Sequence, residues 1–211
     1  MPRPRKNARE EILSGTRQRL LDAAAVEFAR EGYVGANINR ISQTAGFAKG
    51  TIYNHFPSKR ALMLALIDRI AAAHVDFILH RVQQEPDFVR RLSCFFSAGF
   101  AFVEQQPVQA AVIINTVYGP DAAFKTRVFS AYEALFMLIF QDIVEAGIAR
   151  GDFRPVDPDL TTVMLMSIYL GSCALMETDG GIGIDPEQVA AFVLDGLRRR
   201  EPSPGSEKGN P

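Results

Sequence analysis

The chain has 211 residues, of which 47% are hydrophobic, and a formal net charge of −1. It is long enough to bury a core, either as one large domain or as a small domain joined to a larger one. The two cysteines, Cys94 and Cys173, lie far apart in apolar segments. This spacing argues against a disulfide framework or a CxxC metal ribbon and favours a reduced, cytoplasmic setting.

The charge is unevenly distributed along the chain. Residues 1–60 contain 11 basic and 5 acidic residues, a net charge of +6, whereas residues 61–211 contain 12 basic and 19 acidic residues, a net charge of −7. A basic segment joined to an acidic remainder favours a polyanionic partner for the first part, although chance asymmetry would give the same pattern. Residues 1–9 are basic but are not followed by an apolar signal core, so we expect no export.

Helical periodicity dominates the sequence, and no alternating strand pattern is present. We predict a first helix from Thr16, a possible N-cap, to Gly32, a natural helix stop. Two short helices follow, at 38–45 and 48–56, separated by Gly46. Three helices within about 45 residues have the spacing of a DNA-binding helix-turn-helix.

The rest of the chain is also predicted to be helical. Glycine and proline residues divide it into helices at about 58–84, 86–106, 107–118, 121–150, 158–177 and 186–200. The run from Leu160 to Met176 is uncharged, but it is shorter than the ~20 residues that span a bilayer. We therefore predict an internal or interface helix there and no membrane association.

The most informative segment is 37–56. Ile52 and Phe56 are four residues apart and should share one helix face, which we expect to pack on Phe28, Ile41 and Ala45. The opposite face presents groups suited to phosphates and base edges, with a glycine that permits close approach: Lys49, Gly50, Thr51, Tyr53, Asn54 and His55.

This segment resembles the DNA-binding domain of the TetR family of repressors. The run from Ala48 to Phe56 is similar to the family's recognition helix, Ala45-Gly46 to its turn, and Lys59 to the lysine that follows. The resemblance implies that Thr51, Tyr53 and Lys59 hold the phosphate backbone. Three further residues would lie nearest bases or phosphates, Lys49, Gly50 and Asn54, with Asn39 contributing from the preceding helix.

Two departures concern possible backbone contacts. Asn37-Ile38 replaces the usual threonine-rich start of the second helix, and Ala48 replaces a common serine. Both changes remove a hydroxyl group, which affects contact details and leaves the motif intact.

We therefore predict an all-α protein with two domains. Residues 1–60 form a three-helix helix-turn-helix DNA-binding domain, in which 1–13 are a basic, flexible arm that either follows a minor groove or remains solvated. Residues 61–200 form a larger helical domain for effector binding and dimerisation, and 201–211 a disordered tail.

The larger domain is rich in phenylalanine and methionine. Ordinary core packing accounts for most of these residues, but the resemblance implies a pocket between the helices that begin near residues 58, 86 and 121. Without central charges, we expect an apolar or aromatic effector beside five candidate residues, Phe96, Phe100, Asn115, Tyr118 and Phe136.

The predicted function is ligand-responsive transcriptional regulation, as a repressor released from palindromic double-stranded operator DNA. A homodimer would form through 158–177 and 186–200, the second with an apolar face of Ala190, Val193, Leu194 and Leu197. The alternatives are a helical small-molecule-binding protein, or an enzyme, with a vestigial DNA-binding segment. We predict neither catalytic nor metal residues and no cofactor, because no catalytic constellation is recognisable and His74 and His80 are six residues apart.

Overall fold

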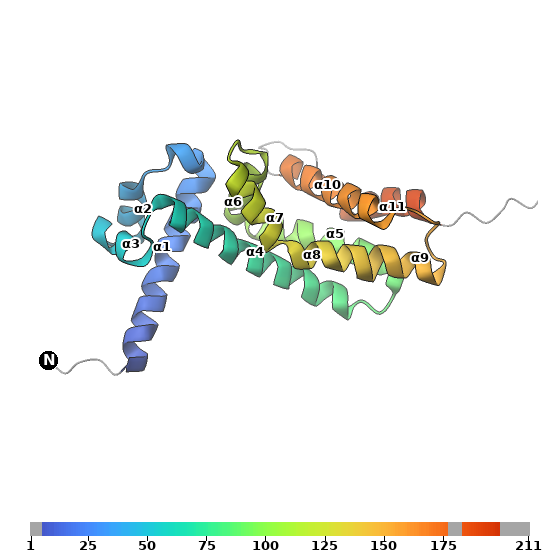
Figure 1. Cartoon of the computed structure of the whole chain (residues 1–211), viewed down its shortest axis with the longest axis horizontal. Helices are drawn as coiled ribbons and strands as arrows, with labels where there is room; N and C mark the ends of the chain where they lie inside the picture. Colours follow the sequence, from blue (N-terminus) through green and yellow to red (C-terminus); the bar gives the residue numbers. More distant parts are fainter. Residues whose placement is uncertain (1–5, 177–182, 199–211) are drawn as a thin grey trace, which may run out of the picture. The chain divides into compact units, whose positions relative to one another are not determined.

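A computed structural model describes residues 6–176 and 183–198, and it confirms the predicted all-α class. The only β-type contact among these residues is an isolated bridge between Phe153 and Arg198. The helices are labelled in Figure 1. They are α1 (Lys6–Gly35), α2 (Ile38–Ala45), α3 (Lys49–His55), α4 (Lys59–Gln84), α5 (Phe88–Gln105), α6 (Pro107–Tyr118), α7 (Ala122–Ala131), α8 (Glu133–Met137), α9 (Ala146–Arg150), α10 (Pro158–Met176) and α11 (Pro186–Leu197).

The chain folds into two compact units, which we describe separately. The first contains residues up to 76 together with 102–133, and the second contains 77–101 together with 134 onward. The predicted DNA-binding domain, 1–60, lies within the first unit. Its boundary at residue 60 stays a prediction, and the predicted tail, 201–211, lies outside the described residues.

Helix α1 begins ten residues earlier than predicted. Thr16 does not cap the helix, because its hydroxyl donates to the Ile12 carbonyl one turn back, at 2.9 Å. The segment from Lys6 is therefore helical, and only residues 1–5 of the predicted flexible arm lie outside the described chain. The residues preceding Thr16 include alanine, arginine and glutamate, which are good helix formers, so the helix continues toward the N-terminus.

The predicted interruption at Gly32 is confirmed. Gly32 has φ 64° and ψ 179°, a conformation that only glycine adopts readily, so the helical path breaks there before α1 ends at Gly35. The short helix α2 has both predicted ends. The Asn37 side chain accepts the Asn39 N–H at 2.8 Å, and Gly46 closes the helix with φ 74°.

The predicted core of the helix-turn-helix is also confirmed. The side chains of Phe28, Ile41, Ala45, Ile52 and Phe56 are all buried. Helices α1, α2 and α3 thus enclose one small apolar core, and burial of one face of α3 leaves its other face toward solvent.

The predicted single helix from Asp121 to Arg150 is interrupted. Asp121 caps α7 by accepting the N–H groups of Ala123 and Phe124, but Tyr132 leaves helical geometry with ψ 8°. A π-helical segment, Leu138–Glu145, then separates α8 from α9. Local periodicity did not reveal this change, because π-helical and α-helical segments both place an apolar stripe on one face.

The second unit is built around aromatic rings. Phe95, Phe96 and Phe100 of α5 are buried against Tyr169 of α10, and the Phe100 and Tyr169 rings are stacked with centroids 5.9 Å apart. A Cβ atom at Gly99 would lie 2.3 Å from the Tyr169 ring, so a glycine is needed there for the ring to lie against α5.

Helix α10 is long and apolar enough to span a membrane by length and composition alone, and it is the one such helix among the described residues. Part of it faces the core of its own unit, since Thr162, Leu165, Met166, Tyr169 and Cys173 are buried. The predicted internal placement is therefore correct for one face. The other face carries exposed apolar residues, Leu160, Val163, Met164 and Leu175.

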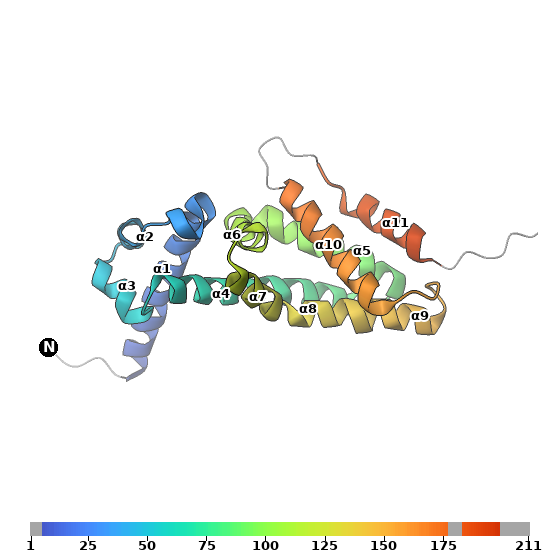
Figure 2. The same cartoon turned by 45° about the horizontal axis from the view of Figure 1, so that its top comes forward.

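Helix α11 lies beside α10 (Figures 1 and 2) and ends at Leu197 rather than at residue 200. The predicted apolar face of this helix, Ala190, Val193, Leu194 and Leu197, is buried within the unit. These four residues are therefore not available to a second subunit, contrary to the prediction. The exposed apolar residue of α11 is Phe192, with 75% of its surface accessible.

Candidate nucleic-acid interface

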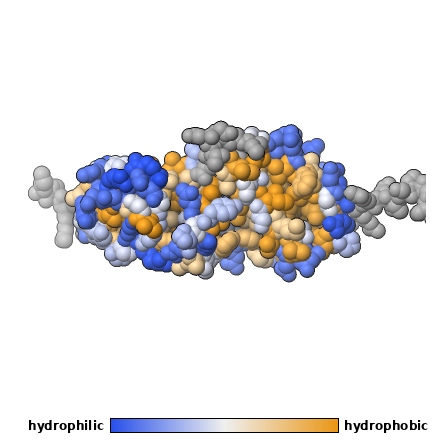
Figure 3. Space-filling model, turned by 90° about the horizontal axis from the view of Figure 1, so that it is seen from above, coloured by the Kyte–Doolittle hydropathy of each residue, from blue (hydrophilic) through white to orange (hydrophobic). Residues whose placement is uncertain are grey.

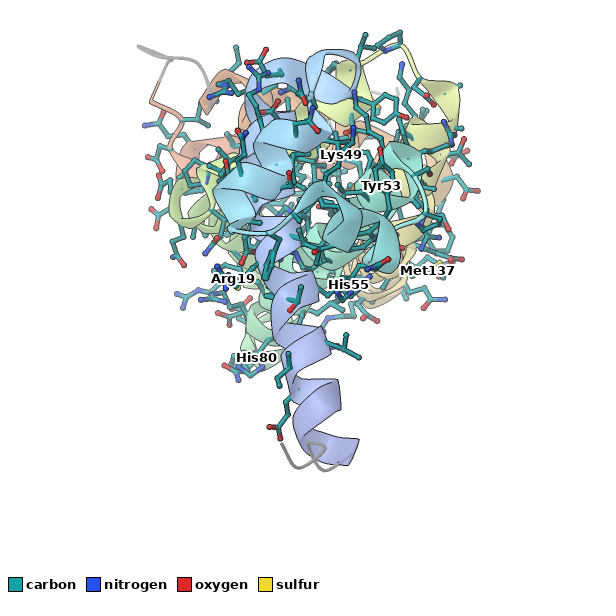
Figure 4. All side chains as sticks on the ribbon, turned by 90° about the vertical axis from the view of Figure 1, so that its left-hand side faces the viewer. Arg19, Lys49, Tyr53, His55, His80 and Met137 are labelled. Atoms are coloured by element: carbon teal, nitrogen blue, oxygen red, sulfur yellow. The ribbon has the colours of Figure 1, made fainter. Side chains whose placement is uncertain are left out.

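The exposed face of α3 carries the side chains that the sequence predicted for DNA contact. Lys49, Tyr53 and Asn54 are exposed, whereas Thr51 and His55 are half-buried. Figure 4 looks onto this end of the first unit and labels Lys49, Tyr53 and His55.

The backbone on this face is accessible. A Cβ atom placed on Gly50 would meet no atom within 4 Å, so a phosphate or base edge can approach the chain there. No aspartate or glutamate occurs in α2 or α3, which carry Arg40, Lys49 and His55 instead. The surface is therefore suited to a polyanion.

Arg19 of α1 supports the turn between α2 and α3, a role that sequence analysis did not identify. Its guanidinium donates to the Ala45 carbonyl at 2.9 Å and lies 4.7 Å from the centre of the Phe47 ring. One side chain thus holds the last carbonyl of α2 and the aromatic residue of the turn. The one sequence signal for this role is an arginine on a helix with a buried apolar face, and this signal is weak because many helices share it.

Glu27 of α1 fixes the start of α2 and was also not identified. Its side chain is only 6% exposed, and it accepts the Asn37 N–H at 2.8 Å and pairs with Arg40 at 2.8 Å and Arg30 at 3.0 Å. Burial raises the pKa of the Glu27 carboxyl, but the hydrogen bonds and the two arginines outweigh it and leave this pKa below its ordinary value. The carboxylate is therefore charged and holds two helices together.

Lys59, at the start of α4, makes contacts within the protein. Its ammonium donates to the Val34 carbonyl at 3.0 Å and lies 5.0 Å from the centre of the Tyr33 ring. Desolvation lowers the pKa of Lys59, against a smaller opposing effect of Glu27. The predicted phosphate contact would require this ammonium to bind both the Val34 carbonyl and DNA, and it stays a prediction.

Asn39, the residue of α2 that was predicted to contribute to DNA contact, is exposed at the start of that helix.

The five predicted effector residues belong to different units. Phe96, Phe100 and Phe136 are in the second unit, where the first two are buried and Phe136 is half-buried. Asn115 and Tyr118 are in the first unit, where Asn115 donates to the Ala29 carbonyl at 3.2 Å and Tyr118 is 60% exposed. Asn115, but none of the other four, lines a cavity in that unit.

His74, for which the sequence analysis predicted no metal-binding role, is buried in the first unit. Its Nδ1 lies 3.0 Å from the Tyr132 hydroxyl, and its ring stacks on Phe102 with centroids 4.1 Å apart. Burial lowers the pKa of His74 to about 3. Within the described part of the chain, no three His, Cys, Asp or Glu side chains are grouped to hold a metal ion.

Comparison with known proteins agrees with this geometry. Residues 20–66 match the model of the bacterial regulatory proteins of the tetR family. The chain is similar to the HTH-type transcriptional repressor KstR2 of Rhodococcus jostii, with 25% identity over 191 residues that cover 87% of this chain and 92% of the relative. It is also similar to the HTH-type transcriptional activator FasR of Mycolicibacterium smegmatis, with 34% identity over 143 residues, 64% of each chain.

Among solved structures, the fold resembles that of the transcriptional regulator FadR from Bacillus subtilis in complex with stearoyl-CoA. The TM-score is 0.73 with 18% identity, over 84% of this chain and 95% of that one. The match over residues 20–66 includes α2, α3 and the residues that frame them. Residues 20–66 therefore carry the segment that the tetR family model describes, and along most of its length the chain is similar to transcriptional repressors such as KstR2.

Proposed function

We propose that this protein is a ligand-responsive repressor that binds palindromic operator DNA as a homodimer through α2 and α3. The observation that carries the proposal is the exposed face of α3, with Lys49, Tyr53 and Asn54 accessible on a helix whose other side is buried. Tyrosine and lysine side chains suit phosphates, and an asparagine can make a bidentate contact to adenine. Repression, rather than activation, is supported by the similarity to KstR2.

The supports behind α3 favour a rigid recognition surface. Arg19 holds the turn from α1, and Glu27 holds the start of α2. Because α2 is fixed at both ends, the turn that leads into α3 loses little conformational freedom when the helix enters a major groove, so more of the contact energy appears as affinity. Asn54 would then read bases, while Thr51, Tyr53 and Lys59 would hold the backbone.

Dimerisation is supported by the exposed apolar residues of α10 and α11. Leu160, Val163, Met164 and Leu175 are each about half exposed, and Phe192 is 75% exposed. Figure 3 shows hydrophobic side chains gathered on the face that carries these two helices. Such a surface is typical of a subunit interface, and two-fold symmetry would match an inverted-repeat operator.

The effector is proposed to be apolar, such as an acyl chain, and to bind in the second unit. Support comes from the ring cluster of Phe95, Phe96, Phe100 and Tyr169, and from the similarity in fold to FadR, which was solved with stearoyl-CoA. Because these rings are already in contact, the effector would have to displace them. Binding would therefore favour a rearranged unit and shift the DNA-binding population.

Operator binding is tested by fluorescence anisotropy with labelled DNA from upstream of the protein's own gene. We expect tight, salt-sensitive binding, and Asn54→Ala should weaken binding to the operator much more than to unrelated DNA. Gln105→Ala, at an exposed position of α5 outside the two DNA-binding helices, is the control. Equal affinity for both DNAs in the wild type would refute a specific regulator and favour the small-molecule carrier.

Effector response is tested by adding stearoyl-CoA to the protein–operator complex. A differential affinity of about 1–3 kcal/mol between the two states would lower operator affinity roughly 5–150-fold. Operator affinity unchanged at saturating stearoyl-CoA would exclude this compound as effector. Chemical conversion of the compound by the protein would favour the enzyme alternative.

A further inference from the structure

A cavity of about 490 Å³ opens within the first unit, beside the break in α1. Its walls come from the end of α1, the start of α4, and α6 with the loop that leads to α7. Most of the lining is apolar, with three aromatic rings, Phe28, Tyr33 and Phe124. Its size and lining fit a small organic molecule. Neither the proposed DNA contacts nor the proposed apolar effector site uses this cavity.

Two polar side chains of the cavity already donate to backbone carbonyls. The Thr116 hydroxyl donates to the Val112 carbonyl at 2.6 Å, and the Asn115 amide donates to the Ala29 carbonyl at 3.2 Å. The oxygen of each group remains able to accept. The Tyr33 hydroxyl can donate or accept, and the remaining polar side chains, Glu31 and Asp121, are carboxylates, which only accept when ionised.

The charges of the lining are all negative. Glu31 and Asp121 are its only charged residues, and no lysine, arginine or histidine lines the cavity. Both contacts of Glu31 with arginine, to Arg30 at 2.9 Å and Arg40 at 3.4 Å, use Oε1 and leave Oε2 to accept from a ligand. Backbone N–H donation, chiefly from Phe124, lowers the pKa of Asp121, which is therefore ionised at neutral pH.

Two aromatic rings of the cavity have cations of the protein against one face. The Lys59 ammonium lies 5.0 Å from the centre of the Tyr33 ring, and the Arg60 guanidinium lies 4.6 Å from that of Phe124. Because these faces are occupied, a ligand ammonium would be held by the carboxylates, and the rings would pack against the apolar part of the ligand.

We propose that this cavity is a binding site for a small organic ammonium ion that carries an aromatic group, such as an arylalkylamine. The ammonium would donate to Glu31, Asp121 and the Asn115 carbonyl oxygen, and the aromatic part would pack on the ring-lined wall. A carboxylate of the same shape would be repelled by the Oε2 atom of Glu31, which no arginine contacts, whereas Asp121 is already paired with Arg60 at 3.4 Å. The site therefore selects for cations, which separates it from the apolar effector site proposed in the second unit.

The proposal is tested with tryptamine, whose indole fluorescence reports its own binding because the chain contains no tryptophan. We expect the anisotropy of tryptamine to rise and saturate, with a dissociation constant below about 1 mM. Indole-3-propionate, which has a carboxylate in place of the amine, should bind at least about tenfold more weakly. Absence of saturation by tryptamine, or equal affinity for the two compounds, would overturn the proposal.

Variants of the two carboxylates test whether tryptamine binds in this cavity. Glu31→Gln and Asp121→Asn combined should weaken tryptamine binding about tenfold or more, because both negative charges are removed. Asparagine can still cap α7. Glu31→Gln alone, a partly exposed position, should weaken binding by a smaller factor, and serves if the double variant fails to fold. The control is Asp68→Asn, a carboxylate paired with Arg127 away from the cavity lining. Wild-type affinity in a folded Glu31→Gln variant would overturn the proposal.

Discussion

Glu27 of α1 accepts a hydrogen bond from the backbone N–H of Asn37, the residue that itself caps α2, at 2.8 Å. The same carboxylate pairs with Arg40 inside α2. One buried side chain thus sets where α2 begins relative to the long helix α1 behind it. The position of α3 depends on this contact, because α3 follows α2 after a short turn.

Replacement of Glu27 should weaken both folding and DNA binding. Glu27→Ala leaves the Asn37 N–H without its partner, and we expect a loss of about 1–3 kcal/mol in the free energy of unfolding. Urea titration followed by circular dichroism measures this loss. Glu31→Ala, a neighbouring and more exposed carboxylate, should cost less. An unchanged midpoint in Glu27→Ala would show that the Asn37 contact contributes nothing to stability.

The pH dependence of stability follows from the direction of the Glu27 pKa. Because its pKa is lowered in the folded state, Glu27 contributes stability above the ordinary value of 4.5, and that contribution is lost as the pH falls through the folded pKa. Below about pH 4.5, the free energy of unfolding of Glu27→Gln should therefore decrease less steeply with falling pH than that of the wild type. If the free energy of unfolding decreases equally steeply with falling pH in the two proteins, Glu27 is not the ionised carboxylate proposed here.

His74 should make folding pH-dependent in a different range. Its pKa is lowered to about 3 from the ordinary value of 6.5, so the unfolded chain binds one more proton than the folded chain between these values. Stability should be fully present above pH 6.5 and decrease by about 1.4 kcal/mol per pH unit as the pH falls from there toward 3.

The contribution of His74 is measured with His74→Gln. Glutamine keeps an acceptor for the Tyr132 hydroxyl but does not titrate. Between pH 6 and 4, the free energy of unfolding of His74→Gln should therefore decrease less steeply than that of the wild type, by about 1.4 kcal/mol per pH unit. The exposed His80, replaced in the same way, is the matched control and should retain the wild-type slope. A wild-type slope in His74→Gln would mean that another group causes the acid sensitivity.

Lys59→Ala tests whether an ammonium held by the protein also contacts DNA. We expect weaker binding to all sequences and a decrease of about one unit in the slope of log affinity against log salt. Arg60→Ala is the control, because the Arg60 guanidinium is stacked on Phe124 and paired with Asp121. If the slope is the same in Lys59→Ala and wild type, the Lys59 ammonium serves only Val34.

Phe192→Asp tests the proposed dimer surface. Phe192 is 75% exposed in the single chain, so a charge there should leave the subunit folded while raising the dimer dissociation constant at least about tenfold. Sedimentation velocity over a dilution series measures this change. Leu194→Asp is the comparison, and it should unfold the unit because Leu194 is buried. A Phe192→Asp protein with the wild-type dissociation constant would place the interface elsewhere.

The sequence determined the helix-turn-helix, because each of its signals is local. The caps at Asn37 and Gly46 depend on residues a few positions away, and so does the apolar spacing of Ile52 and Phe56. The polar face of α3 follows from the same periodicity. For this reason the two short helices and the exposure of Lys49, Tyr53 and Asn54 were predicted correctly, whereas the partial burial of Thr51 and His55 and the start of α1 at Lys6 were not.

Only the tertiary structure decided which partner each side chain has. Local pattern identified the apolar face of α11 but not that Leu194 packs within its own unit and Phe192 faces outward. In the same way, Glu27 is a salt-bridged anchor and Lys59 is bonded to Val34 because folding brings distant backbone groups to them. Helix formation depends on neighbours within a few residues, but hydrogen-bond partners and cavities depend on distant contacts that the local pattern does not contain.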